Sequence, residues 1–271
     1  MVTPGLDANE NMIRDEVWAL VPARSGSKGI TDKNLQEVEG VSLLGLSVLA
    51  GTASAAIDRC FVSTDSQAYA DEARRYGAEV PYLRPDSASS DTATDLDVFL
   101  HFLNWAAANI EHLPWAVVHL RPTTPCREPE RVNEAVQLAR EVSASATAIR
   151  SVHAAAESPF KWFLRDTDGY LTTFDRGREL DASNRSRAEF EDVYIPNGYA
   201  DVVFTSHIIR TDLLHGNAVR PFLTEPVIEV DGPFELELLR RADSIPPALL
   251  SAASLVRGNR NSAPERETTP S

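Results

Sequence analysis

The stretch that decides the fold is WALVPARSGSKGITDKN, residues 18–34, where a short apolar run breaks into glycine, serine and basic residues. The apolar run is typical of a buried β-strand. Gly26 and Gly29 allow backbone N–H groups to turn toward an anion, and Arg24 and Lys28 add full positive charges. The stretch therefore predicts a strand followed by a phosphate-binding loop, although a solvated turn with surface cations fits the same residues taken alone.

The spacing in this loop differs from the two most familiar phosphate-binding motifs. RSGSKG contains neither the G-x-x-x-x-G-K-[ST] spacing of a Walker A loop nor the G-x-G-x-x-G of a dinucleotide-binding turn. A phosphate site here would use the same physics, with inward-facing amides and a cationic fork, in a different motif.

Strands and helices alternate from this loop to about residue 152. Strands are predicted within 59–65, 116–120 and 146–152, and helices within 41–54, 66–79, 91–110 and 128–142. Asp91 or Thr92 is expected to cap the third helix, and Pro129 to open the fourth. This alternation predicts an α/β fold of Rossmann type, with a mainly parallel, doubly wound sheet and ligands at the carboxyl ends of its strands.

The pattern changes between residues 157 and 195, which we interpret as an insertion that forms a small β-hairpin subdomain. SPFKWFLRDTDGYLTTF is typical of a hairpin that turns at Asp168 and Gly169. Strand-like YADVVFTS and PVIEVD follow, and then a closing helix, PFELELLRRAD. The predicted organisation is a disordered tail at 1–15, one domain at 16–256 and a second disordered tail at 257–271.

Composition excludes several classes of function. The 271 residues include 26 Lys+Arg against 40 Asp+Glu, a formal net charge of -14, which argues against a general nucleic-acid or anionic-membrane binder. No apolar run approaches the roughly 18 residues of a membrane span. Two cysteines without metal spacing, and no recognisable signal peptide, favour the cytoplasm. A small anionic ligand remains compatible, because a cationic pocket can lie within an acidic protein.

Five stretches, in order, resemble the CMP-sugar-acid synthetases, the acylneuraminate cytidylyltransferase family. They are VPARSGSKGITDKN, FVSTDSQAYADEARRYGAEVPYLRPDSASSDTA, LRPTTPCR, PNGYADVVFTS and VIEVDGPFELEL. The resemblance implies a fold like that of nucleotide-diphospho-sugar transferases and a homodimer. It also implies transfer of CMP from CTP to a small anionic acceptor with release of pyrophosphate, assisted by Mg²⁺ or Mn²⁺.

The resemblance also implies roles for individual residues at the nucleotide. Lys28, Arg24 and Asp231 are the expected catalytic residues, with Lys28 offsetting the charge that builds on the leaving pyrophosphate. The loop that the family uses around the cytosine and ribose would include Arg84. The complete expected nucleotide site is Ala23, Arg24, Ser25, Gly26, Ser27, Lys28, Lys33, Asn34, Arg84, Ser89 and Asp91.

Glu229 and Asp231 are the expected metal ligands. Residues i and i+2 of a strand share one face, so the two carboxylates would converge, as suits Mg²⁺ with phosphate oxygens and water. A pair of exposed strand carboxylates is the plain alternative. The family usually has Asp at the first position, so Asp231 is the firmer assignment.

The acceptor is where the sequence departs from the family. Arg121 stands where the family commonly has Gln, and an Arg fork prefers a carboxylate, phosphate or phosphonate. Ile195 stands where sialic acid synthetases often have Arg. The resemblance implies an acceptor site of Arg121, Pro122, Thr123, Thr124, Asn197 and Gly198, with Lys161, Arg185 and Arg187 contributed across a dimer interface.

Two acceptors remain open at this point. One is a nonulosonic acid of the sialic, legionaminic or pseudaminic type, and the other is a small phosphonate, which needs no general base because it is already ionised. A non-catalytic nucleotide-binding module is a further alternative. Glu229 and Asp231 argue against that module, because it would have no need of metal-binding carboxylates.

Overall fold

A computed structural model describes residues 10–85 and 92–261 of the chain. Within them, a seven-stranded sheet has the order β11-β6-β10-β5-β1-β4, with β9 paired to β6. All of its strands run in one direction except β9 and β10, so the predicted mainly parallel α/β sheet is confirmed. The strands are β1 (Ile13–Pro22), β4 (Arg59–Ser63), β5 (Leu113–His119), β6 (Ala148–Ala154), β9 (Tyr194–Pro196), β10 (Asp201–Phe204) and β11 (Val219–Leu223).

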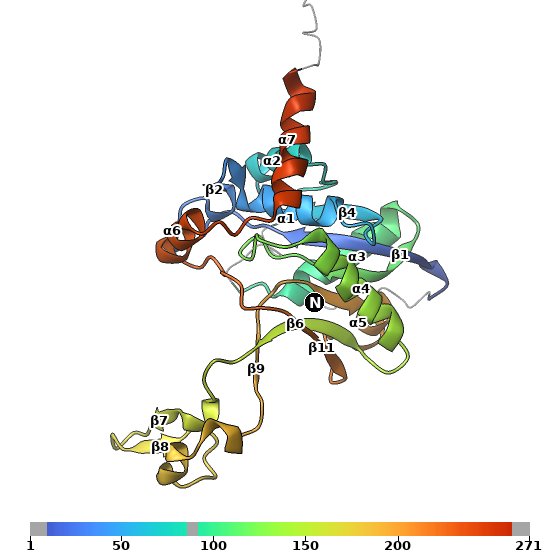
Figure 1. Ribbon diagram of the computed structural model, residues 1–271. Helices are drawn as coiled ribbons and strands as arrows, with labels where there is room; N and C mark the ends of the chain where they lie inside the picture. The colour runs from blue at the N-terminus through green and yellow to red at the C-terminus, as the bar shows by residue number, and fades with distance from the viewer. Residues whose placement is uncertain (1–9, 86–91, 262–271) are drawn as a thin grey trace, which may run out of the picture.

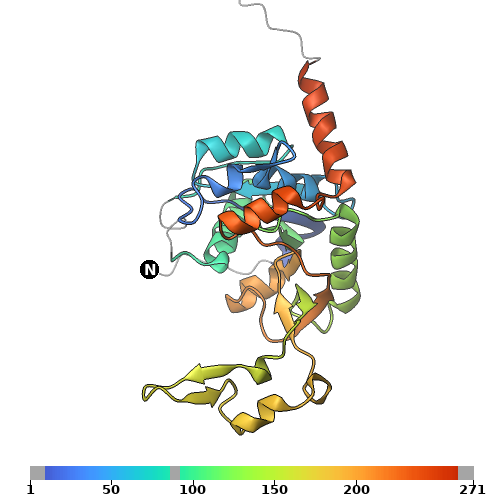
Figure 2. The ribbon, with the colours of Figure 1, turned by 60° about the vertical axis from the view of Figure 1, so that its left-hand side comes forward.

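Helices cover both faces of this sheet (Figures 1 and 2). Side chains alternate between the faces along β1: Ala19 and Val21 join one buried cluster, and Trp18 and Leu20 join the other. The first cluster includes α1 (Leu43–Thr52), α2 (Gln67–Arg75), α4 (Pro129–Val142), α6 (Pro233–Arg241) and α7 (Pro247–Asn261). The second includes α3 (Asp95–Asn109) and α5 (Thr205–Thr211).

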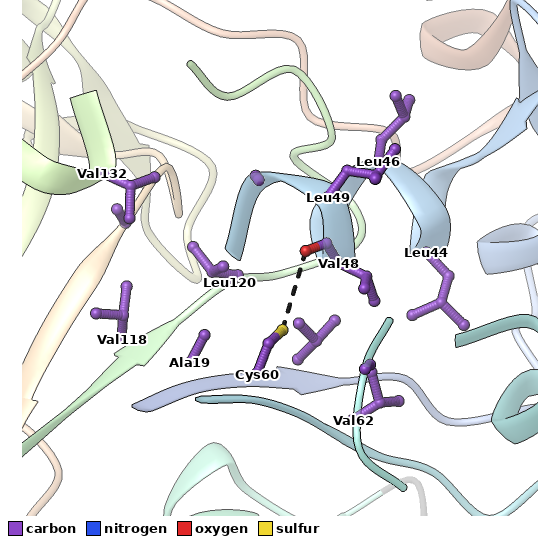
Figure 3. Packing of buried hydrophobic residues seen from close by; sticks show 14 of the residues in the cluster. Ala19, Leu44, Leu46, Val48, Leu49, Cys60, Val62, Val118, Leu120 and Val132 are labelled. Atoms are coloured by element: carbon purple, nitrogen blue, oxygen red, sulfur yellow. Dashed lines mark hydrogen bonds between the residues drawn. The ribbon is translucent and has the colours of Figure 1, made fainter. Parts of the chain in front are cut away.

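Helix α1 packs closely on β1 and on the edge strand β4 (Figure 3). A Cβ at Gly51 would lie 2.9 Å from Cys60 Sγ and 3.3 Å from Leu120 Cδ1, so only glycine allows this approach. The Cys60 thiol donates to the carbonyl of Val48, and burial raises its pKa to about 12, so Cys60 is an inert packing residue. This packing fixes the strand ends from which the ligand-type loops extend.

Residues 155–195 form an arm that projects from the body of the molecule (Figures 1 and 2). Its hairpin pairs two short antiparallel strands around a turn at Gly169, whose φ is +92°, as predicted. Large apolar side chains on the arm are exposed, among them Tyr170 and Leu171. The arm contains η4 (Pro159–Lys161), β7 (Phe163–Arg165), β8 (Leu171–Thr173), η5 (Leu180–Asn184) and η6 (Arg187–Glu189).

The ordered chain reaches further toward both ends than predicted. A 3₁₀ turn, η1 (Glu10–Met12), precedes β1, and Ile13 pairs with Leu113 of β5, inside the expected tail at 1–15. Helix α7 continues to Asn261, into the expected tail at 257–271. Leu249 and Ala253 anchor this helix in the core. Residues 1–9 and 262–271 lie outside the described part of the chain.

Two predicted elements are corrected. Helix α3 begins at Asp95, and its cap is Thr94, because Thr94 and Asp97 exchange hydrogen bonds in a capping box. PVIEVD is extended but forms no strand: β11, missed from the sequence, takes the place beside β6. Short elements η2 (Lys33–Leu35), β2 (Glu37–Val38) and β3 (Val41–Ser42) link β1 to α1.

None of the helices in the described ranges is long and apolar enough to cross a membrane.

Candidate active site

Loops that follow β1, β4 and β5 meet at the carboxyl edge of the sheet, around a cavity of about 270 Å³. Asp201, the first residue of antiparallel β10, pairs with His119 at the end of β5, so the loop before β10 reaches the same edge. Eight of the predicted site residues line this cavity: Arg24, Ser27, Lys33, Asn34, Arg84, Arg121, Pro122 and Thr123.

Hydrogen bonds connect the glycine loop to the end of β4 and to the loop that follows it. The backbone N–H and the hydroxyl of Ser25 donate to the two oxygens of Asp65 at 2.8 and 3.0 Å. Ala23 is buried, and its N–H donates to the Ser63 carbonyl at 2.9 Å. Gly26 has φ +72°, a left-handed conformation that favours glycine. Ser25 and Ala23 therefore shape the loop, and Arg24 and Ser27 are the loop side chains that reach the cavity.

One wall of the cavity is cationic. Arg24, Lys33 and Arg84 lie along it, and Arg84 is 5% exposed. Burial lowers the pKa of Arg84, and the charge of Asp65 opposes that shift. Lys28, the residue most favoured from the sequence, is exposed on the same loop and lies outside the lining formed by the described residues. Its catalytic role stays a prediction.

The predicted metal-binding acids lie beside this wall, although they are not in a strand. Lys33 Nζ donates to the Val230 carbonyl at 2.9 Å and lies 3.7 Å from Asp231 Oδ1. The Val230 N–H donates to the Thr123 carbonyl at 2.7 Å. A Cβ at Gly29 would lie 2.8 Å from the Asp231 carbonyl oxygen, so the glycine loop touches this segment. The tertiary fold thus brings Glu229 and Asp231 to the loop that the sequence predicted them to oppose.

Arg121 lines the cavity, but both of its terminal nitrogens are paired with carboxylates of the chain, so its contact with an acceptor stays a prediction. Its Nη2 donates to Asp95 at 2.9 Å, and its Nη1 donates to Asp201 at 3.1 Å. Burial would raise the pKa of Asp201, but its contacts with His215 and Arg121 outweigh burial, so the pKa lies below its ordinary value. Arg121 lines the cavity as part of an ion-pair network, which we call the Arg121 network: Asp95, Arg121 and Asp201.

Asn197, Gly198 and Thr124 are buried behind Arg121, and none of them is part of the cavity lining. The Asn197 amide donates to Thr224 Oγ1 at 2.7 Å, and Thr124 Oγ1 donates to the Asn197 carbonyl at 3.2 Å. A Cβ at Gly198 would lie 3.2 Å from Arg121 Nη1. These residues therefore support the acceptor end of the cavity from behind, which corrects their predicted role as direct contacts.

Sequence reasoning missed Arg127, which ties these loops together. The side chain is fully buried and donates to the carbonyls of Tyr199, Gly198 and Arg121, the last two at 2.9 and 2.7 Å. Burial lowers its pKa to about 9, so it stays charged at neutral pH. Its signal was its position as the last residue of LRPTTPCR, the loop already identified as part of the site.

The cations expected to act across an interface all belong to the arm. Arg187 donates to the carbonyls of Ala155 and Ala156 at 2.8 and 2.7 Å, where the arm joins the body. Lys161 Nζ lies 5.8 Å from the ring centroid of Phe190, and Arg185 is exposed. None of these cations lines the cavity of its own chain in the described ranges, and Ser89 and Asp91 fall outside those ranges.

Comparisons with known proteins agree with this geometry. Residues 18–206 match the cytidylyltransferase family. A CMP-N,N'-diacetyllegionaminic acid synthase from Legionella pneumophila is 25% identical over 83% of this chain and 95% of its own length. An N-acylneuraminate cytidylyltransferase from Escherichia coli is 28% identical over 83% of this chain and 52% of its own length, so the chain spans about half of that relative.

Solved structures support the fold. A CMP:2-keto-3-deoxy-manno-octonic acid synthetase complexed with CTP superposes with a TM-score of 0.61, at 15% identity, over 83% of this chain and 97% of the other. A 4-diphosphocytidyl-2C-methyl-D-erythritol synthase from Anaerococcus prevotii superposes with a TM-score of 0.56, at 11% identity, over 83% of this chain and 95% of the other. Both are α/β nucleotidyltransferases, and likeness at this level of identity shows the fold alone.

Proposed function

Because the chain belongs to the cytidylyltransferase family, as the match over residues 18–206 shows, we propose that it transfers CMP from CTP to a nonulosonic acid. The two relatives named above act on acids of this kind, by their names. One observation carries the proposal: Arg24, Lys33 and Arg84 line one cavity, and Lys33 also contacts the segment that holds Asp231. The chain is thus a nucleotidyltransferase in which a cationic wall adjoins two acids.

The reaction requires little covalent chemistry from the protein. The anomeric hydroxyl oxygen of the acceptor forms a bond to the α-phosphorus of CTP, the bond from that phosphorus to the pyrophosphate oxygen breaks, and the hydroxyl proton passes to solvent or to the leaving pyrophosphate. Arg24, Lys33 and Arg84 would hold the triphosphate and offset the charge that develops on the leaving pyrophosphate. Lys28, on the exposed glycine loop, would add a further positive charge that offsets the negative charge of the bound nucleotide.

We also propose a divalent cation, Mg²⁺ or Mn²⁺, held by Asp231 with Glu229. No group of three or more potential ligands occurs in the described ranges. Mg²⁺ at nucleotide sites usually takes one or two carboxylates and completes its shell with phosphate oxygens and water, so the two acids fit it. Asp231 is 77% exposed and able to take such a ligand. The cation would neutralise phosphate charge and orient the triphosphate.

A sugar acid is favoured over a small phosphonate as the acceptor. Both relatives named above act on nonulosonic acids, by their names, whereas a paired Arg121 fork favours neither acceptor over the other. We further propose a cytoplasmic homodimer, in which the exposed apolar side chains of the arm meet a second copy. Lys161 and Arg185 would then approach the acceptor site of the partner.

The test is pyrophosphate release from CTP and MgCl₂ with a panel of N,N'-diacetyllegionaminic, N-acetylneuraminic and pseudaminic acids, and methylphosphonate. We expect release with at least one nonulosonic acid, and loss of at least a hundredfold in Asp231→Ala. Glu237→Ala, an exposed acid on α6 that pairs with Arg241, is the matched control and should stay active. The proposed acceptor would be refuted if pyrophosphate were released with methylphosphonate alone, or with none of the three nonulosonic acids.

A further inference from the structure

Asp95 introduces a negative charge into a cavity whose other charged lining residues are cations. It is the first residue of α3, its side chain is 44% exposed, and it lines the cavity together with Thr94 and Val98. Arg24, Lys33 and Arg84 line the same cavity. The sequence analysis assigned Asp95 no role, because the helix start was expected at Asp91 or Thr92.

The orientation of Asp95 is held by a chain of buried contacts. Its Oδ2 accepts from Arg121 Nη2 at 2.9 Å, and Arg121 Nη1 donates to Asp201. Asp201 is 1% exposed and is anchored in turn by the N–H and hydroxyl of Ser151, at 2.9 and 3.0 Å. In the described part of the chain, the other oxygen, Oδ1, makes no hydrogen bond. One oxygen is therefore fixed by Arg121, and the side chain as a whole stays 44% exposed in the cavity lining.

A second observation points to the same place. His119 is fully buried behind Asp95, its Nδ1 lies 4.0 Å from Asp95 Oδ2, and neither ring nitrogen has a hydrogen-bond partner within the described ranges. Nearly all buried polar atoms in proteins are paired, so an unpaired imidazole beside a carboxylate marks a site built for a tighter arrangement. Because His119 is buried at 4.0 Å from Asp95, it offers that carboxylate no hydrogen bond, and Arg121 is the side chain that holds it.

Charge decides which part of a nucleotide or sugar acid meets Asp95. Like charges repel, so the phosphates and carboxylates of a ligand are kept away from the Asp95 carboxylate. Burial raises the pKa of Asp95, but the Arg121 guanidinium outweighs burial and holds that pKa below its ordinary value, whereas buried His119 is neutral at pH 7. An ionised carboxylate only accepts hydrogen bonds, and one of low pKa is a poor base, so its natural partner is a hydroxyl.

We propose that Asp95 is a specificity-determining residue that accepts a hydrogen bond from a sugar hydroxyl of the bound substrate, with Arg121 as its positioning residue. This inference rests on the proposed function, because that function supplies the sugar. The hydroxyl belongs to the ribose of CTP or to the acceptor, and the two sources share one chemistry that the experiment separates.

The experiment compares wild type, Asp95→Asn and Asp201→Asn by calorimetric binding of CTP, 2′-deoxy-CTP and 3′-deoxy-CTP with Mg²⁺. The KM for N,N'-diacetyllegionaminic acid is measured alongside. A hydrogen bond to a charged group contributes roughly tenfold or more in affinity. If a ribose hydroxyl is the donor, wild type binds CTP roughly tenfold more tightly than one of the two deoxy analogues, and Asp95→Asn binds the two equally. If the acceptor is the donor, Asp95→Asn keeps its CTP affinity and raises that KM by about tenfold.

Asp201→Asn tests the positioning role of Arg121, because it breaks the other ion pair of that side chain and leaves the Asp95 carboxylate in place. We expect it to lower the melting temperature and to weaken the hydroxyl contact less than Asp95→Asn does. The inference is overturned if Asp95→Asn changes neither quantity, if it weakens every ligand equally, or if both variants lose the preference equally. Failure of wild type to bind CTP at all would refute the proposed function instead.

Discussion

Arg121 and Asp201 show how single buried charges control this site. Asp201 is 1% exposed and carries a charge that is balanced by Arg121 and by hydrogen bonds from Ser151. Removing one partner of a buried ion pair leaves the other charge uncompensated. The energetic role of Arg121 is therefore to neutralise two carboxylates of its own chain, which leaves less of its charge for a bound anion.

Arg121→Gln should accordingly act on stability first. We expect the variant to lose about 3 kcal/mol of unfolding free energy, because the Gln amide cannot balance two carboxylates. Urea unfolding monitored by circular dichroism measures this loss. Arg131→Gln is the control, since Arg131 is half-exposed and its carboxylate partner, Glu134, is exposed. If Arg121→Gln were as stable as wild type and changed only the use of the acceptor, the result would support the prediction that Arg121 binds the acceptor.

His119 should make the protein sensitive to acid. Burial lowers its pKa to about 3, whereas an unfolded histidine titrates near 6.5. The unfolded chain thus binds the proton first, so stability is complete above pH 6.5 and is lost as the pH falls toward 3. Between pH 7 and pH 5 this group alone should cost about 2 kcal/mol.

The measurement is urea unfolding at pH 7, 6 and 5 for wild type and His119→Leu. The variant should show a shallower decline, because Leu has a similar volume and no proton to bind. His101 and His207 also have lowered pKa values and contribute to the decline in both proteins, so the difference isolates His119. Parallel declines would show that His119 does not titrate in this range.

At the scale of elements, the site depends on close contact between the glycine loop and residues 229–231. Lys33 bonds the Val230 carbonyl, Thr123 accepts from the Val230 N–H, and Gly29 lies against Asp231. Neither segment belongs to the sheet at these residues. Their mutual contact, rather than strand pairing, therefore sets the distance between the cationic wall and the two acids.

Gly29→Ala tests this contact. A Cβ 2.8 Å from the Asp231 carbonyl oxygen must push the two segments apart, which should lower kcat/KM at least tenfold while costing about 1–3 kcal/mol of stability. Steady-state pyrophosphate release and urea unfolding give the two quantities. Gly177→Ala is the control, because its nearest atom is at 3.7 Å, an ordinary contact in the arm. Unchanged activity in Gly29→Ala would mean that the spacing does not matter.

At the scale of the whole molecule, the arm is the part least able to bury its own apolar surface. It projects away from the body, and its tip exposes Tyr170 by 74% and Leu171 by 52% (Figures 1 and 2). Exposed apolar groups that cluster on a projecting element commonly mark an interface. The proposed homodimer follows from this surface.

A double substitution, Tyr170→Ser with Leu171→Ser, should convert a dimer into a monomer at micromolar concentration. Sedimentation velocity measures the change, and calorimetry should show that CTP binding is retained, because the cavity lies in the body. Leu255→Ser is the control: that side chain is 72% exposed on α7, far from the arm in the fold. A wild-type monomer, or a dimer that survives in the double variant, would contradict the proposal.

What the sequence by itself determined is what local pattern can encode. Two-residue and 3.6-residue periods marked the strands and helices of the sheet, and glycines and prolines marked the loops RSGSKG and RPTTP at strand ends. These signals depend on neighbours in the chain, and the alternation of strands and helices predicted the mainly parallel sheet but not its strand order. The cationic side of the cavity was therefore visible in the sequence.

Only the tertiary structure decided which charged side chains are neutralised by ion pairs within the chain. Arg121 meets Asp95 across 26 positions and Asp201 across 80, and Lys33 meets Val230 across 197. Pairings at such separations have no signature in local pattern, and they overrode the expectation of an open Arg121 fork. They also placed Asp231 by contact with Gly29 rather than by a strand. The physical reason is that burial and ion pairing depend on the surroundings of a side chain, which only the folded chain supplies.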